Sequence, residues 1–358
     1  MTRTLRLGTR RSALAMVQSG MVAAAVTAAT GRAVELVEIT TYGDTSQATN
    51  ELIAQIGGTG VWVNSLREAL LREEVDFAVH SLKDLPTAEP ERLVLAAVPE
   101  REDVRDVLVA RDGRKLADLP AGARIGTGSL RRAAQLRLLR PDIEVVAIRG
   151  NVDTRVGYVE SGRVDGVVLA YAGLNRLGRI GEATDLFDPA EFLPAPGQGA
   201  LAVECRENDA TLREALGALD HRPTRAAVLA ERALLAALEA GCSAPVGGYA
   251  LAHHENEQEL TVTGIVASTE SRGTPQSVRG SLTGPADEAH RLGTELAARM
   301  LAQGAAALMN KGTTAVVDTG GGHTVTAERP GTTAVVDTGG GRAVTAERPG
   351  TTQVGDTQ

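Results

Sequence analysis

Strand-like and helix-like segments alternate through the first two hundred residues, and this order constrains the fold more than any other feature of the chain. Apolar runs at 5–7, 34–40 and 75–79 have the character of strands, and helical patterns over 12–29 and 65–72 lie between them. Strands that alternate with helices are typical of a parallel sheet covered by helices. The chain is therefore predicted to have an α/β fold.

A second stretch of the chain repeats this order. Strand patterns occur at 124–125, 144–148 and 167–170, and helical patterns over 129–140 and 152–160 separate them. Because each stretch has its own set of strands and helices, the pattern predicts two α/β domains in succession.

Two crossings join these domains. Residues 99–104 are predicted to form a hinge from the first to the second, and the proline- and glycine-rich run 194–199 brings the chain back. The predicted first domain therefore comprises 1–99 with 200–218, and the predicted second domain comprises 104–194. A cleft is expected between them.

The remainder of the chain predicts a small third domain and a repetitive tail. A helical pattern over 224–240 belongs to an α+β domain that spans 222–309. In the tail, 312–358, residues 313–331 and 332–350 are nearly identical copies of one nineteen-residue sequence. Two full copies are too few for a stable solenoid, and Gly, Thr and Pro dominate them, so the tail is predicted to be mostly disordered.

Net charge and aromatic content argue against a nucleic-acid partner. The chain carries 37 basic and 45 acidic residues, a net charge of −8, whereas nucleic-acid binding usually needs a basic surface. Only 2% of its residues are aromatic, too few for a base-stacking platform. The six His and two Cys show no metal-ligand clustering, so no metal site is predicted.

Cysteine content and hydropathy patterning favour a cytoplasmic protein. Two cysteines suit a reducing compartment and offer no disulfide framework. No apolar run is expected to reach transmembrane length, so no membrane partner is predicted. Arg10-Arg11 and the apolar residues after them resemble a twin-arginine export signal, but Gln18, Ser19 and Gly20 interrupt the apolar run.

Cations and hydroxyl groups gather where the predicted strands end, which is where ligands of open α/β sheets bind. The run Gly-Thr-Gly-Ser-Leu-Arg-Arg at 126–132 has the form of an anion cradle at a helix start. Alone it could equally be a solvated helix face, but arginines at the next strand end favour a ligand with several negative charges. The residues of this kind are Arg10, Ser12, Lys83, Thr127, Ser129, Arg131, Arg132, Arg149, Arg155 and Arg176.

Asp84 and Cys242 allow two interpretations each. Asp84 lies among cations beside Lys83, either as a salt-bridge partner or helix cap, or as a carboxylate that stabilises a cation formed during a reaction. Cys242 follows Gly241 just past a helix end, whose partial negative charge does not lower a thiol pKa. It is therefore either a small buried residue or a covalent anchor, rather than a low-pKa nucleophile.

From about Leu5 to about Met309 the chain resembles the porphobilinogen deaminase family. The motifs that carry the resemblance are Gly-Thr-Arg-Arg-Ser at 8–12, His-Ser-Leu-Lys-Asp-Leu-Pro at 80–86, Gly-Ser-Leu-Arg-Arg at 128–132, Arg-Gly-Asn-Val-Asp-Thr-Arg at 149–155, Pro-Ala-Pro-Gly-Gln-Gly-Ala at 194–200 and Glu-Ala-Gly-Cys-Ser-Ala-Pro-Val-Gly at 239–247. The resemblance implies a monomer with three domains, the first two similar to periplasmic binding proteins.

The resemblance also implies a transferase that joins four porphobilinogen molecules into the linear tetrapyrrole hydroxymethylbilane, with release of ammonia, in porphyrin and haem biosynthesis. It implies a dipyrromethane cofactor attached by a thioether to Cys242, and Asp84 as the catalytic aspartate near the pyrrole nitrogens. By the same resemblance, the acetate and propionate groups of cofactor and substrate bind Arg10, Ser12, Lys83, Thr127, Ser129, Arg131, Arg132, Arg149, Arg155, Arg176 and Gln198.

The chain departs from the family in two places. The family usually has lysines in a flexible lid around 55–62, where this chain has Gln55 and Thr59, and Ala240 stands where glycine is commoner. Two alternatives to an active enzyme stay open: a non-enzymatic anion-binding protein of the same two-lobed architecture, and an inactive or slow member of the family. A covalent dipyrrole on Cys242 would separate the enzyme from both.

Overall fold

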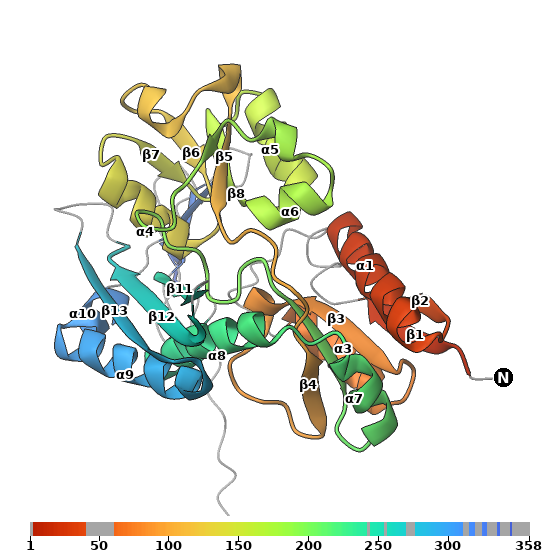
Figure 1. The fold of residues 1–358 in the computed structure, drawn as a ribbon. Helices are drawn as coiled ribbons and strands as arrows, with labels where there is room; N and C mark the ends of the chain where they lie inside the picture. Colours follow the sequence, from red (N-terminus) through yellow and green to blue (C-terminus); the bar gives the residue numbers. More distant parts are fainter. Residues whose placement is uncertain are drawn as a thin grey trace, which may run out of the picture.

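The computed structural model describes residues 3–40, 61–241, 244–253, 256–269 and 276–310, together with four short strands in the C-terminal tail. Figure 1 shows two α/β domains, the first at the lower right and the second at the top, and a smaller C-terminal domain at the lower left. The predicted fold class is confirmed. The residue bounds predicted for the domains stay predictions.

In the described residues, the first domain is a five-stranded sheet with three helices. Its elements are β1 (Leu5–Thr9), α1 (Ala13–Thr30), β2 (Val34–Glu38), α3 (Val61–Leu71), β3 (Phe77–Ser81), β4 (Leu93–Ala97), β10 (Leu201–Arg206) and α7 (Ala210–Gly217). The strand order is β2-β1-β3-β10-β4. Val22 of α1 and Leu212 of α7 pack on one face with Phe77, and Leu66 of α3 packs on the other face with Ala78, because neighbouring strand residues point to opposite faces.

The second domain has the same construction. Its elements are β5 (Asp106–Ala110), β6 (Arg124–Gly126), α4 (Leu130–Leu139), β7 (Glu144–Val146), α5 (Val152–Glu160), β8 (Gly166–Ala170), α6 (Tyr171–Arg176) and β9 (Asp185–Leu186). The strand order is β7-β6-β8-β5-β9. Leu136 of α4 packs on one face with Ile125, and Val156 of α5 and Leu174 of α6 pack on the other with Val167.

The strand–helix alternation predicted parallel sheets, but both sheets are mixed. β1 pairs in parallel with β2 and β3, and β6 with β7 and β8, whereas β10 is antiparallel to β3 and β5 is antiparallel to β8. Each antiparallel strand follows a crossing from the other domain. It therefore begins at the edge where the parallel strands end, with Asp106 opposite Ala170 and Leu201 opposite Ser81.

The two crossings pack side by side between the domains. The N–H of Glu102 in the first crossing donates to the carbonyl of Gly199 in the second at 3.4 Å. A Cβ on Gly199 would lie 2.3 Å from the Glu102 oxygen, and Gly199 has a φ of +87°. Glycine is thus required at this position both for space and for its backbone conformation.

The C-terminal domain is a three-stranded antiparallel sheet packed against helices. Its elements are α8 (Arg222–Ala237), β11 (Val246–His253), β12 (Asn256–Ala267), β13 (Ser277–Pro285), α9 (Ala289–Ala302) and α10 (Ala305–Asn310). Leu234 of α8 and Leu296 and Met300 of α9 form its core with Leu260 and Val262 of β12. The predicted helix over 224–240 corresponds to α8.

The tail contains strands at equivalent positions of its two repeats. The strands are β14 (Ala315–Asp318), β15 (Thr324–Ala327), β16 (Val335–Val336) and β17 (Val344–Thr345), each antiparallel to the next. The other tail residues lie outside the described part of the chain, so the predicted disorder of the tail stays a prediction.

Helix α1 is the one helix in the described residues that is long and apolar enough, by length and composition, to cross a membrane. The sequence pattern predicted no such run because Gln18, Ser19 and Gly20 interrupt it, yet the mean hydropathy of α1 is 1.5. In the fold, Val22 and Val26 are buried in the core of the first domain. These two residues therefore pack within that domain, although only 22% of the helix is buried.

Candidate active site

A cavity of 530 Å³ lies between the first two domains. It is lined by residues of both, from the strand ends and the loops that follow them. Six of its described lining residues are basic and two are acidic, so the cavity favours a ligand with several negative charges. The basic residues are Arg10, Arg11, Lys83, Arg132, Arg155 and Arg176, and the acidic residues are Asp84 and Asp153.

The start of α1 brings Arg10 and Ser12 to the cavity. The Ser12 hydroxyl caps the helix by accepting the N–H of Ala15 at 3.4 Å, and the helix start adds a partial positive charge. One turn further, buried Gln18 is hydrogen-bonded through its amide to the Ser81 hydroxyl, with distances of 3.1 and 3.2 Å. This contact fixes α1 against the end of β3.

Lys83 lies on a short 3₁₀ turn, Leu82–Asp84, directly after β3. Its Nζ donates to Oε1 of Gln198 at 3.5 Å. Burial and the nearby positive charge of Arg132 lower the pKa of Lys83 to about 8, although the charge of Asp84 opposes them. The charge on Lys83 is therefore lost at a lower pH than that of an ordinary lysine.

Asp84 is exposed and lines the cavity. The other acidic lining residue, Asp153, is paired with Arg179, whereas Asp84 has no hydrogen bond or ion pair within the described part of the chain. Burial lowers the pKa of Lys83 and of Arg155, and the charge of Asp84 opposes that effect in both. The salt-bridge and helix-cap interpretations thus find no partner among the described residues, and the geometry offers a carboxylate to a ligand.

The predicted anion cradle precedes α4. Ser129 caps this helix by accepting the N–H of Arg132 at 3.4 Å, and Thr127 accepts the N–H of Ser129 at 3.2 Å. A Cβ on Gly128 would lie 2.7 Å from the carbonyl oxygen of Ile148, so the loop approaches the next strand as only glycine allows. Thr127 and Ser129 shape this loop without being among the described residues that line the cavity.

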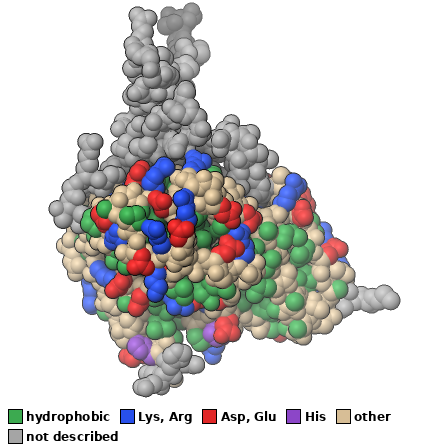
Figure 2. All heavy atoms as spheres, turned by 90° about the horizontal axis from the view of Figure 1, so that it is seen from above, with side chains coloured by type: hydrophobic (Ala, Val, Ile, Leu, Met, Phe, Trp, Pro, Cys, Tyr) green, Lys and Arg blue, Asp and Glu red, His purple; other side chains and the backbone are tan. Residues whose placement is uncertain are grey.

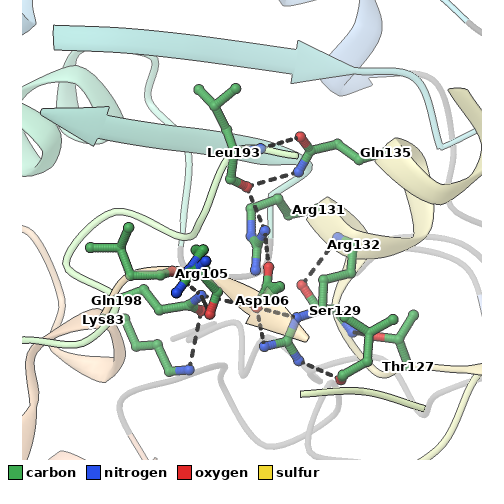
Figure 3. A network of polar contacts seen from close by, with 12 residues as sticks. Lys83, Arg105, Asp106, Thr127, Ser129, Arg131, Arg132, Gln135, Leu193 and Gln198 are labelled. Carbon is green, nitrogen blue, oxygen red and sulfur yellow. Dashed lines mark hydrogen bonds and ion pairs between the residues drawn. The ribbon is translucent and has the colours of Figure 1, made fainter. Parts of the chain in front are cut away.

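Arg131 and Arg132 converge on one buried carboxylate, that of Asp106 (Figure 3). Oδ1 of Asp106 accepts from Nε and Nη2 of Arg132 at 3.1 and 2.7 Å, and Nη1 of Arg131 lies 2.7 Å from Oδ2. Burial alone would raise the pKa of Asp106, but the two guanidinium groups overcome it and hold that pKa well below its usual range. Arg132 lines the cavity, whereas Arg131 does not.

Gln198 connects this carboxylate to Lys83 (Figure 3). It is fully buried in the second crossing, and its Nε2 donates to Oδ1 of Asp106 at 2.9 Å and to the carbonyl of Val104 at 2.7 Å. Its Oε1 is the acceptor for Lys83. The amide therefore links a cation of the first domain to an anion of the second.

Arg155 and Arg176 reach the cavity, and Arg149 does not. The Nε of Arg155 is buried without a hydrogen-bond partner among the described residues, and burial lowers the pKa of Arg155 to about 10. Arg176 donates from Nη2 to the carbonyl of Gly199 at 2.7 Å. Arg149 is exposed and lies outside the described lining of the cavity.

Cys242 lies outside the described residues, as do Gln55 and Thr59, so the anchor and the lid stay predictions. Cys205 is fully buried in the core of the first domain, and burial raises its pKa to about 11. Cys205 is therefore a small core residue.

The sequence pattern missed Asp106, whose carboxylate contacts Arg131, Arg132 and Gln198. The prediction considered the ends of parallel strands, whereas Asp106 is the first residue of the antiparallel strand β5. One sequence signal could have found it: the charged residue Asp106 directly precedes the apolar run Val107–Ala110.

Two family models match this chain. Residues 5–214 match the model described as porphobilinogen deaminase, dipyrromethane cofactor binding domain, and residues 225–302 match the porphobilinogen deaminase C-terminal domain. The first match covers the first two domains together, including the residues that line the cavity.

Individual proteins are similar over most of the chain. Porphobilinogen deaminase 1 of Streptomyces coelicolor is 63% identical over 319 residues, which cover 86% of this chain and 98% of the relative. Porphobilinogen deaminase of Thermobifida fusca is 56% identical over 313 residues, which cover 85% of this chain and 95% of the relative. Among solved structures, a periplasmic binding protein of Salmonella typhimurium with high arginine specificity has a TM-score of 0.35 and 17% identity, over 61% of this chain and 92% of that one.

Proposed function

Because the chain belongs to the porphobilinogen deaminase family, we propose that the cavity between its first two domains is where porphobilinogen units are bound and joined. The protein is a transferase, a hydroxymethylbilane synthase, which polymerises porphobilinogen to hydroxymethylbilane in tetrapyrrole biosynthesis. The observation that carries the placement of the site is the excess of six basic over two acidic side chains around one cavity.

The basic residues of the cavity bind the acetate and propionate groups of the substrate. Each pyrrole adds two carboxylates, so negative charge accumulates as the product grows, and a single arginine could not balance it. Arg155 supports this role, since its Nε is buried without a partner in the described structure and a carboxylate would supply one. Arg10, Lys83, Arg132 and Arg176 supply further cations, and Ser12 a hydroxyl, from separate elements.

The donor set fits the dipyrromethane cofactor named in the family description. A group of two pyrroles carries four carboxylates, which matches a cavity with several cations and an unsatisfied guanidinium nitrogen. We assign Cys242 as its point of thioether attachment. When bound, the cofactor supplies the pyrrole carbon from which the product is extended.

Asp84 is the proposed catalytic residue. Positive charge develops on the pyrrole nitrogen of the substrate as ammonia leaves, and a fixed carboxylate favours that charged state over the neutral one. Lys83 and Arg155 lie within electrostatic reach of Asp84 and would orient the substrate acids beside it. Asp84 thereby acts on the reacting ring while the cations hold its substituents.

We further propose that the protein works as a monomer in the cytoplasm, without a nucleic-acid or membrane partner. On the face shown in Figure 2, basic and acidic side chains of the described residues are interspersed, as expected from a chain with 37 basic and 45 acidic residues. Val22 and Val26 of α1 pack in the core of the first domain, which supports a helix that stays with the folded domain.

Intact-mass analysis and porphobilinogen consumption by the purified protein test this function together. The expected result is an added mass of two porphobilinogen-derived units, lost in Cys242→Ser and retained in the matched variant Cys205→Ser. An unmodified wild-type protein with full activity would refute the anchor. A protein that neither carries the added mass nor consumes porphobilinogen would be a family member that keeps the fold alone.

A further inference from the structure

We propose that Asp106 is a positioning residue for this site, which holds Arg132 toward the cavity, and that Arg131 acts through Asp106 rather than on the ligand. The proposal rests on the proposed function of the cavity. It assigns Arg131 and Arg132, adjacent in the sequence, to different tasks.

The backbone places Asp106 directly behind the cavity wall. Strand β5 begins with Asp106 and pairs antiparallel with β8, so Asp106 lies opposite Ala170, which lines the cavity. The Asp106 side chain is itself fully buried and is not among the described lining residues. Its carboxylate therefore supports the wall from behind, without direct access to the ligand.

Arg131 points toward Asp106 and the backbone of Leu193 (Figure 3), and neither residue is among the described lining of the cavity. Its Nη1 lies 2.7 Å from Oδ2 of Asp106 and donates to the carbonyl of Leu193 at 2.5 Å, and its guanidinium carbon lies 5.9 Å from the centre of the Phe192 ring. The Leu193 carbonyl also accepts from Gln135 at 2.9 Å. The Nε of Arg131 is buried without a hydrogen-bond partner among the described residues, but the side chain is only 4% exposed and lies outside the described lining of the cavity. A ligand carboxylate could therefore reach Arg131 only if the side chain left this buried position.

Arg132 is held in one orientation but still faces the cavity. Asp106 accepts from its Nε and Nη2, and the carbonyl of Val168 accepts from its Nη1 at 2.9 Å. Its charge acts on Lys83 and on Arg155, whose pKa values it lowers together with burial. Asp106 thus accepts two of these three hydrogen bonds, and loss of its charge would weaken both at once and leave the guanidinium less firmly held.

Asp106 also acts on Lys83, through Gln198 and through its charge. The charged groups that face Lys83 are Arg132 and Arg131 on α4, which lower its pKa along with burial, and Asp84 and Asp106, which raise it. Removing the charge of Asp106 removes one of the two groups that raise the pKa. The charge of Lys83 would then be lost at a lower pH, an effect that a defect of packing alone would not produce.

The test compares Asp106→Asn with the wild-type holoenzyme in cofactor occupancy by intact mass, thermal midpoint, and kcat and KM for porphobilinogen as a function of pH. The expected kcat/KM is lower by at least about thirtyfold, the lower end for breaking a buried charge pair. The fall of kcat/KM at alkaline pH, the alkaline limb of the profile, is expected to shift to lower pH. Asp165→Asn is the matched control: Asp165 accepts the N–H of Arg124 at 2.7 Å in the same domain, beside the opposite end of β8, and its loss should leave the profile unchanged.

Asp106→Asn can also fail to fold, because it leaves two buried guanidinium groups without their counter-charge. The double variant Asp106→Asn/Arg131→Met removes one of those charges. The proposal expects it to fold better than Asp106→Asn alone, while its alkaline limb moves back toward higher pH, because Arg131 lowers the pKa of Lys83. A double variant no more stable than the single one, or an Asp106→Asn enzyme with normal kcat/KM and an unshifted limb, overturns the proposal. An inactive wild-type protein would instead refute the proposed function.

Discussion

Arg101 and Glu231 form a bidentate ion pair, with distances of 2.7 and 2.9 Å, that joins the first crossing to helix α8. Glu231 is fully buried and also accepts the N–H of Gly197 in the second crossing at 2.6 Å and the N–H of Ala250 in β11 at 2.8 Å. One carboxylate thus fixes both connections between the lobes to the C-terminal domain.

Glu231→Gln should destabilise the protein by about 3–5 kcal/mol, the usual cost of leaving one partner of a buried pair uncompensated. Chemical denaturation followed by circular dichroism would measure it. Glu288→Gln is the matched control, because Glu288 pairs with Arg291 at an exposed position, where ion pairs contribute little. Equal stability of the two variants would show that the Arg101 pair is dispensable.

Asp84→Asn should keep the fold and the cofactor but lose activity by at least about a hundredfold, the scale for removing one electrostatic group from an active site. Asp84→Glu should retain more activity, since its charge survives at a displaced position. Turnover of porphobilinogen by variants of known cofactor occupancy checks this. If Asn at position 84 turns over as fast as Asp, the catalytic assignment is wrong.

Activity should fall as pH rises through about 8, because Lys83 loses its charge there and with it the attraction for substrate carboxylates. By pH 9 only about a tenth of Lys83 would be charged, so KM should rise. Lys83→Arg stays charged and should move the alkaline limb to higher pH. If activity falls at the same alkaline pH in both proteins, a group other than Lys83 causes the fall.

Arg155→Leu should weaken binding or cofactor assembly more than Arg149→Leu. Arg155 lines the cavity with a buried, unsatisfied Nε in the described structure, whereas Arg149 is exposed outside the described lining. Loss of a partly solvated charge pair should cost a few kcal/mol at most, about ten- to a hundredfold in KM or occupancy. A larger loss in the Arg149 variant would mean that Arg149 moves to the ligand.

Truncation after Lys311 should leave turnover and the thermal midpoint nearly unchanged, because a tail rich in Gly, Thr and Pro buries little apolar surface. Differential scanning calorimetry of the full-length and shortened chains makes the comparison. A fall of several degrees after truncation would show that the repeats pack against the domains.

The parts of the fold that follow local patterns were predictable from the sequence. Strand–helix alternation placed β1, α1 and β2 and then β6, α4 and β7, because their apolar spacing repeats over several turns or pleats. β5 was missed because its place in the sheet depends on a crossing between domains, which no local pattern reveals. The different roles proposed for Arg131 and Arg132 could not be predicted either. Two adjacent arginines in one helix look alike in the sequence, which does not show how each one contacts a buried carboxylate.

The position of β10 between β3 and β4 has a consequence for the order in which a nascent chain completes its two lobes. Among the described strands, β4 pairs only with β10, which follows it only after residues 98–200 have been made. The second sheet, β5 to β9, is continuous in sequence and closes shorter loops. During synthesis the second lobe should therefore fold first. Until β10 has been made, one edge of β3 stays unpaired, and another strand could pair with it.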